Sequence, residues 1–200
     1  MFKVIVISKE DLFSGEAEII NQLMGTGDFN FHLRKKTASE KDLRKLLYKI
    51  KPEFFSRIVI HQQFNMEKEF GFYGIHLPGA ERENYVALKA EGHKIISTSI
   101  HVLKEFDPAR KNYKYIFFSP LFPSISKAGY APIYSEEVLR ADLKEIKNKS
   151  NLIALGGIEE KNLKEVKEFG FAGAAVLGCV WESKTPVKTL QFFLKASAEH

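Results

Sequence analysis

A basic motif, His32-Leu33-Arg34-Lys35-Lys36, follows the second of several short apolar runs in the sequence. Successive side chains of an extended chain point to opposite faces, so His32, Arg34 and Lys36 are expected on one side. An arginine and a lysine that converge in this way suit a phosphate or a diphosphate. The alternative is an exposed basic strand end, and the motif taken alone favours that simpler interpretation.

The segment from Ser119 to Gly129 carries the strongest functional signal. It contains two prolines, which stiffen the chain, and Ser124, Ser126 and Lys127 then bring two hydroxyls and an ammonium close together. Such a loop can clamp a leaving diphosphate, with the lysine neutralising the charge that develops as the bond breaks. The length and rigidity of the segment favour this function over a Pro/Ser/Gly surface loop.

Glycines stand at the ends of two later apolar runs, as Gly156-Gly157 and as Gly178. Without side chains, these residues let backbone N–H groups approach an anion. The loops after strands seven and eight are the common phosphate site of (β/α)8 barrels. The three glycines together therefore predict a phosphorylated ligand, whereas the neighbouring Cys179 is predicted to be a small core residue.

Polar residues also stand at the ends of the remaining runs. His61-Gln62-Gln63 can bind a heterocycle through hydrogen bonds or simply mark a strand that ends in water. The hydroxyls of Ser97–His101 can cap a helix, which is their commoner role, or bind an anion at its N-terminus. Glu81 stands alone, and one carboxylate holds Mg²⁺ poorly without help from substrate phosphates.

The elements that must position these residues alternate regularly. Short runs rich in β-branched and aromatic residues predict strands, and helix-period segments lie between them. Ser39 and Ser135 are predicted helix N-caps, Gly170 is predicted to follow a helix, and the last helix is expected to begin near Thr185-Pro186. The predicted strands span residues 2–8, 29–34, 57–61, 74–77, 94–99, 115–122, 151–157 and 173–181.

Repeated strand–helix units predict parallel strands joined by right-handed crossovers. We expect an α/β fold in which residues 1–200 form a single (β/α)8 TIM barrel with short loops, because 200 residues are near the lower limit for that fold. A doubly wound open sheet is the alternative topology. No G-x-G-x-x-G motif follows the first run, which removes the simplest dinucleotide-binding hypothesis.

The composition is 44% hydrophobic and 28% charged, which fits one soluble globular domain and excludes a mainly disordered chain. No apolar run approaches the ~18–20 residues that span a bilayer, and the N-terminus lacks the pattern of a signal peptide. One cysteine excludes an internal disulfide and fits a reducing cytoplasm. The net charge of +5 is spread through amphipathic stretches, so neither a membrane nor a nucleic acid is expected as a partner.

These segments, in this order, resemble the thiamine-phosphate synthase and thiazole tautomerase superfamily. Ser119–Lys127 is the specific match, because it is similar to Gly-Pro-(Ile/Val)-Phe-Pro-Thr-x-Thr-Lys with serines in place of both threonines. His32–Lys36 resembles Gln-Leu-Arg-x-Lys, and Gly74–Leu77 resembles Gly-Val-His-Leu. Ser97–His101 is similar to Gly-x-Ser-x-His, and Ile153–Ile158 to Ile-Ala-(Ile/Leu)-Gly-Gly-Ile.

The resemblance implies a cytoplasmic transferase of thiamine biosynthesis, a thiamine-phosphate pyrophosphorylase. It would join hydroxymethylpyrimidine diphosphate to thiazole phosphate and release diphosphate. By position, Arg34 and Lys36 would hold the diphosphate and Lys127 would assist its departure. The substrate-binding residues implied in the same way are His32, His61, Ser99, Ser124, Ser126, Gly156, Gly157 and Gly178. The expected partners are the phosphorylated pyrimidine and thiazole, and the sequence is compatible with a homodimer.

The chain departs from the family pattern at the expected Mg²⁺ site. The synthases carry Asn-Asp at the end of strand three, where this chain has His61-Gln62, and Glu81 stands near the second family Asp. The resemblance thus implies Mg²⁺ as cofactor, with Glu81 as its ligand. One alternative is a metal-independent thiazole-phosphate tautomerase-like enzyme, although that branch carries a histidine where this chain has Pro120. The other is a non-catalytic paralogue that binds thiazole or pyrimidine phosphates.

Overall fold

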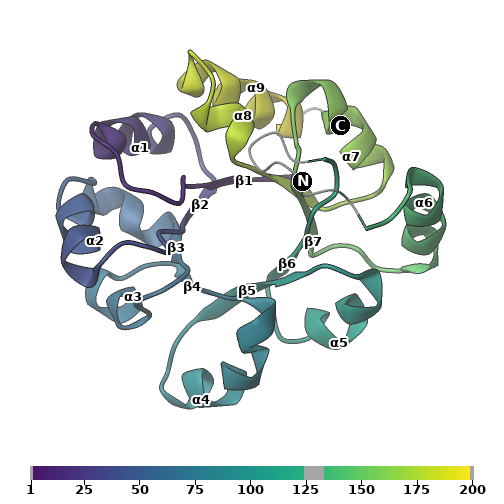
Figure 1. The fold of residues 1–200 in the computed structure, drawn as a ribbon, viewed down its shortest axis with the longest axis horizontal. Helices are drawn as coiled ribbons and strands as arrows, with labels where there is room; N and C mark the ends of the chain where they lie inside the picture. Colours follow the sequence, from purple (N-terminus) through teal and green to yellow (C-terminus); the bar gives the residue numbers. More distant parts are fainter. Residues whose placement is uncertain (1, 124–132, 199–200) are drawn as a thin grey trace.

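The computed structural model describes residues 2–123 and 133–198. Eight parallel strands form a closed barrel in sequence order, and the helices surround it (Figure 1). The strands are β1 (Lys3–Ile7), β2 (Asn30–Leu33), β3 (Ile58–Ile60), β4 (Gly74–Leu77), β5 (Ile95–Ile100), β6 (Tyr115–Phe118), β7 (Leu152–Leu155) and β8 (Gly173–Val176). The predicted (β/α)8 barrel is confirmed, and the open sheet is excluded because β1 pairs with β8.

The helices lie on the outside of this ring, as Figure 1 shows. They are α1 (Glu16–Met24), α2 (Glu40–Leu47), α3 (Asn65–Phe70), α4 (Tyr85–Ala90), α5 (Phe106–Arg110), α6 (Glu136–Glu145), α7 (Leu163–Glu168), α8 (Gly178–Trp181) and α9 (Pro186–Ala198). The predicted caps are confirmed, because the Ser39 and Ser135 hydroxyls accept hydrogen bonds from the third residue beyond each. Within the described ranges, no helix is long and apolar enough to cross a membrane.

Two predicted strands end four or more residues earlier than the sequence indicated. β6 ends at Phe118 rather than at residue 122, because Pro120 has no N–H to donate to the strand ladder. β8 ends at Val176, and the apolar residues that follow form the short helix α8. The Trp181 indole N–H at the end of α8 donates to the Ile7 carbonyl at 2.7 Å, which holds this helix against the end of β1.

Strand side chains alternate between two buried layers. The larger layer lies between the barrel and the helices and includes most of the apolar core. The smaller layer fills the barrel interior and contains Ile5, Ile7, Phe117 and Ile153 among others. His32 also lies in this interior, where its ring contacts Tyr115 and Phe117. The interior therefore combines an apolar side with a polar one.

A buried ion pair fixes the chain at the end of β2. Lys35 and Glu16 are 0% and 1% exposed, and the Lys35 Nζ lies 2.5 Å from the Glu16 Oε1. The same ammonium donates to the carbonyls of Lys9 and Asp11, each at 2.8 Å, so all three of its protons have acceptors. Burial raises the pKa of Glu16 and lowers the pKa of Lys35, because each charge is removed from water.

We expect Lys35→Met to lower the free energy of unfolding by about 3–5 kcal/mol, because it leaves the Glu16 carboxylate buried and unpaired. Urea unfolding measures this change. Glu16→Leu combined with Lys35→Met should recover most of the loss, since two apolar side chains then replace the pair. Lys36→Met is the matched control, because Lys36 is 59% exposed, and it should change stability by no more than about 0.5 kcal/mol. Equal losses in Lys35→Met and Lys36→Met would contradict this account.

Candidate active site

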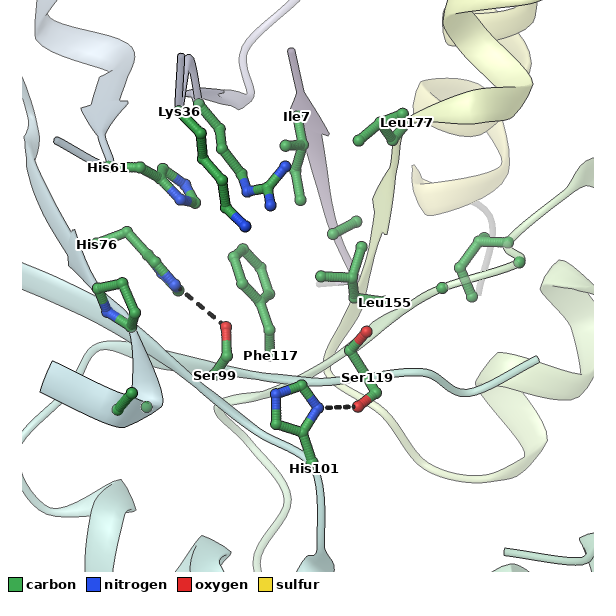
Figure 2. Close-up of a pocket in the computed structure, with 18 of the residues that line it drawn as sticks. Ile7, Lys36, His61, His76, Ser99, His101, Phe117, Ser119, Leu155 and Leu177 are labelled. Atoms are coloured by element: carbon green, nitrogen blue, oxygen red, sulfur yellow. Dashed lines mark hydrogen bonds between the residues drawn. The ribbon is translucent and has the colours of Figure 1, made fainter. Parts of the chain in front are cut away.

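A cavity of about 740 Å³ opens at the carboxyl ends of the strands. Every strand, or the residue that directly follows it, contributes to its wall. In Figure 2, Lys36 and His61 lie on one side of this space and Leu155 and Leu177 on the other, with Phe117 between them. This is the place where the fold predicts function, and its volume suits a small-molecule ligand.

The basic motif supplies the cationic side of the cavity. Arg34 and Lys36 both line it, whereas Lys35 between them points away into its ion pair with Glu16. The predicted alternation of Arg34 and Lys36 against Lys35 is therefore confirmed. The Arg34 Nη1 lies 2.9 Å from the Glu10 Oε2, which holds the guanidinium in place. Its backbone N–H donates to the Ser8 hydroxyl at 2.9 Å, so the end of β1 positions the motif.

His32 shares the inward side with Arg34, as strand alternation predicts, but it lies deeper in the barrel and is not part of the cavity wall. Its ring is 0% exposed and is absent from the cavity lining. The His32 Nε2 lies 2.6 Å from the Tyr115 hydroxyl, and its Nδ1 lies 2.8 Å from the His61 Nε2. These two hydrogen bonds hold the ring inside the barrel, behind His61, which does line the cavity.

His76 completes this polar side of the barrel. Its ring stacks on His61 with the centroids 4.2 Å apart. The His76 Nδ1 lies 2.8 Å from the Ser97 Oγ. Its Nε2 lies 3.1 Å from the Ser99 Oγ, a contact that Figure 2 shows. The hydroxyls of β5 were expected to cap a helix or to bind an anion. In the structure Ser97 and Ser99 hydrogen-bond to His76, and Ser99 also faces the cavity, so its anion-binding role stays a prediction.

Burial keeps the three histidines uncharged at neutral pH. Removal from water lowers the pKa of His32 and of His61 well below the usual value, and nearby basic groups lower both pKa values further. The pKa of His76 falls to about 3, again mainly through burial and then through the charge of Arg34. The rings therefore donate and accept hydrogen bonds without adding charge to the cavity, and its cations come from elsewhere.

The predicted glycines line the opposite side, and two of them are needed for close packing. Gly156 and Gly157 have φ angles of 99° and 62°, in the left-handed region that favours glycine. A Cβ on Gly157 would lie 2.5 Å from the Pro123 carbonyl oxygen, and one on Gly156 would lie 2.9 Å from the Pro120 Cα. The paired glycines thus let the segment after β6 approach the end of β7. Gly178 lines the cavity at the start of α8.

Glu81, the predicted Mg²⁺ ligand, is exposed and does not line the cavity. Among the described residues, Glu105 is the one carboxylate in the lining, and it is paired with Arg82. By order, His61 stands at the family Asn and Gln62 at the family Asp, so the carboxylate of that pair is absent, whereas Mg²⁺ prefers such oxygen ligands. The residues present in the described part of the chain therefore do not fit Mg²⁺.

Sequence reasoning missed Arg82 and gave no role to His101, although both line the cavity. The Arg82 guanidinium donates to the Ser99 carbonyl at 3.0 Å, and the His101 Nδ1 lies 2.6 Å from the Ser119 carbonyl oxygen. Both residues follow the carboxyl end of a strand, Arg82 after β4 and His101 after β5, which is where function is expected in a barrel. Three predicted residues, Ser124, Ser126 and Lys127, lie outside the described residues.

A family model described as thiamine monophosphate synthase matches residues 4–180. The chain belongs to this family. It is 31% identical to a crystal structure titled thiamine phosphate pyrophosphorylase from Bacteroides thetaiotaomicron, with 100% of both chains covered and a TM-score of 0.82. The predicted family is therefore confirmed.

Two further relatives span a similar length. A thiamine-phosphate synthase of Listeria welshimeri is 26% identical over 186 residues, which cover 88% of this chain and 89% of the relative. A structure titled thiamine phosphate pyrophosphorylase from Pyrococcus furiosus shares the fold, with 23% identity, a TM-score of 0.78, and 99% and 96% of the two chains covered.

We expect Gly157→Ala to destabilise the protein more than Gly71→Ala does. Both glycines have positive φ, so each alanine costs about 1–2 kcal/mol in the backbone. No atom lies within 4 Å of a Cβ on Gly71, whereas a Cβ on Gly157 would meet the Pro123 carbonyl. Overpacking should therefore add about 1–3 kcal/mol at Gly157, measured by urea unfolding of the two variants. Equal losses would show that the loop after β6 does not pack tightly on β7.

Proposed function

We propose that the chain transfers the hydroxymethylpyrimidine group from its diphosphate to the nitrogen of thiazole phosphate. The bond between the pyrimidine methylene carbon and the diphosphate oxygen breaks, and a carbon–nitrogen bond to the thiazole forms. The products are thiamine phosphate and diphosphate. Family membership supports a thiamine-phosphate synthase-like transferase of thiamine biosynthesis and favours neither the tautomerase nor the non-catalytic alternative.

The observation that carries this proposal is the pair of cations, Arg34 and Lys36, on one side of a cavity whose other side is formed by glycines. A departing diphosphate gains negative charge, so fixed cations lower the barrier without needing to reorganise. The link from Arg34 to Glu10 fixes the guanidinium before the substrate arrives. In this scheme, backbone N–H groups near Gly157 and Gly178 bind the thiazole phosphate.

The neutral polar groups have a different role in the proposed reaction. His61 and Ser99 line the cavity near Arg34, and they are placed to contact the pyrimidine diphosphate through hydrogen bonds. His32 acts through His61, to which it is hydrogen-bonded, rather than by direct contact. The transfer needs no general base, because the attacking thiazole nitrogen carries no proton to remove.

The domain boundaries, the cellular compartment and the oligomeric state each rest on a different observation. We propose that residues 1–200 act as a single domain, because β1 to β8 all pair in one barrel. A reducing cytoplasm suits a chain with one cysteine. The expected partners are the two phosphorylated substrates, and a homodimer stays a prediction.

We expect Arg34→Gln to reduce kcat/KM for the pyrimidine diphosphate by roughly 10- to 150-fold, since a hydrogen bond to a charged group contributes about 1.5–3 kcal/mol. Steady-state kinetics of thiamine phosphate formation measures this change. Arg44→Gln is the matched control, because Arg44 pairs with Glu40 and Glu69 on the outer surface. Full activity of Arg34→Gln would remove Arg34 from the diphosphate site.

Lys127→Ala should lower kcat by at least about 100-fold while leaving thermal unfolding unchanged, because the ammonium is expected to neutralise the leaving diphosphate. Parallel measurement of turnover and of Tm separates this role from a structural one. Normal turnover by the variant would contradict the role proposed for Lys127.

A further inference from the structure

Three histidines from neighbouring strands meet beside the cavity. His32 lies in β2, His61 directly follows β3, and His76 lies in β4. One ring nitrogen from each lies within 4.8 Å of the other two. His61 and His76 line the cavity, and His32 is fully buried behind His61. Because parallel strand pairing sets these positions, the cluster is built into the rigid part of the fold.

In two of these rings, those of His32 and His76, one nitrogen is hydrogen-bonded to a hydroxyl group outside the cluster. The His32 Nε2 lies 2.6 Å from the Tyr115 hydroxyl, and the His76 Nδ1 lies 2.8 Å from the Ser97 Oγ. Histidines that bind metal ions nearly always pair the second ring nitrogen with an oxygen, which fixes the tautomer and the ring orientation. The nitrogens left to bind an ion are then the His32 Nδ1 and the His76 Nε2, and the His76 Nε2 must give up its 3.1 Å hydrogen bond to the Ser99 Oγ.

The donor set also indicates which ions are suitable. Each of the three side chains offers one imidazole nitrogen, and imidazole binds metals in its neutral form. Imidazole nitrogen suits Zn²⁺, Co²⁺, Ni²⁺ and Cu²⁺, whereas carboxylate and water oxygens suit Mg²⁺. The cluster offers three ring nitrogens and no carboxylate, so its donors favour these transition-metal ions over Mg²⁺.

We infer that His32, His61 and His76 form a binding site for a first-row transition-metal ion such as Zn²⁺. Three protein ligands leave a fourth position for water or substrate in a zinc site of this kind. Since His61 and His76 face the cavity, an oxygen of a bound phosphate can take that position. This use of the ion rests on the proposed function, whereas the metal site itself does not.

Binding the ion replaces two hydrogen bonds, one from the His76 Nε2 to the Ser99 Oγ and one between His32 and His61, and the larger movement falls on His61. The His32 Nδ1 and the His61 Nε2 are 2.8 Å apart and share a hydrogen bond. Two nitrogens on a tetrahedral Zn²⁺ are about 3.3 Å apart, given bonds of about 2.0–2.1 Å. The ion therefore replaces this hydrogen bond and tilts His61 away from its stack with His76. Within the described part of the chain, His32 is the hydrogen-bond partner of the His61 ring, so this movement breaks that bond and the stacking on His76.

The test uses Co²⁺, because its visible d–d absorption reports nitrogen ligands and tetrahedral geometry without any assay of activity. Protein stripped with EDTA and dialysed is titrated with Co²⁺, and Zn²⁺ and Mg²⁺ are then added as competitors. We expect one tetrahedral Co²⁺ per chain, displaced by Zn²⁺ but not by a large excess of Mg²⁺. A shift of the spectrum on adding inorganic phosphate would place the open position in the cavity.

Variants of the histidines test whether the Co²⁺ absorption arises from this cluster. His61→Gln and His76→Gln should each weaken Co²⁺ binding by more than about 10-fold, and Tyr115→Phe by about 10- to 100-fold through the ring that it orients. His101→Gln is the matched control, because His101 lines the same cavity but lies outside the cluster. Circular dichroism confirms that each variant is folded.

Two results would overturn the inference. Wild-type protein that gives no tetrahedral spectrum has no such site, and unchanged binding in both His61→Gln and His76→Gln places the ion elsewhere. A cobalt spectrum that does not respond to phosphate would keep the metal site but remove its link to the substrate. Loss of thiamine phosphate formation with intact Co²⁺ binding would instead count against the proposed function alone.

Discussion

The buried ammonium of Lys35 is the constraint on which the site depends. Its three hydrogen bonds, to Glu16 and to the carbonyls of Lys9 and Asp11, fix one residue of the basic motif on the helix side of the barrel. Strand alternation then leaves Arg34 and Lys36 facing the cavity. The buried Lys35 charge, which is costly to remove from water, thus fixes the orientation of the Arg34 and Lys36 charges, and these two stay accessible to a ligand.

The barrel interior separates two kinds of chemistry. On one side, neutral histidines and hydroxyls form a hydrogen-bonded network from Tyr115 through His32 to His61, with His76 bound to Ser97 and Ser99. On the other side, small and apolar residues of β7 and β8 leave room for a ligand. Arg34 and Lys36 supply the cations of the cavity, so we expect an anion to bind beside them, and the neighbouring histidines offer nitrogen rather than carboxylate oxygen.

Much of the fold follows from local pattern. Continuous apolar runs predicted the strands, and serines followed by acidic residues predicted two helix starts, because these signals depend on a few neighbouring residues. β8 was predicted too long, since an apolar run such as residues 173–181 suits a buried strand and a buried helix equally well. The end of β6 was missed although Pro120 marks it, because the apolar residues after the proline continue the run.

The site was predictable only in part, because some of its residues come together only through the pairing of distant strands. The rule that the strand ends of a barrel carry function correctly placed several residues in the cavity lining, namely Arg34, Lys36, Ser99, Gly156, Gly157 and Gly178. The histidine cluster was not predicted. His32 is separated by 29 residues from His61 and by 83 from Tyr115, and these residues meet only through the pairing of the strands. Glu81 was expected to bind Mg²⁺ from its position in the sequence, but its side chain is exposed and outside the cavity lining.

The most direct measurement is product formation by the purified protein. Hydroxymethylpyrimidine diphosphate and thiazole phosphate are incubated with the protein, and thiamine phosphate and diphosphate are quantified by chromatography, with added Mg²⁺, with added Zn²⁺ and with EDTA. The account predicts equal amounts of both products in at least one metal condition. Folded protein that binds thiazole phosphate yet forms neither product under any of these conditions would contradict it.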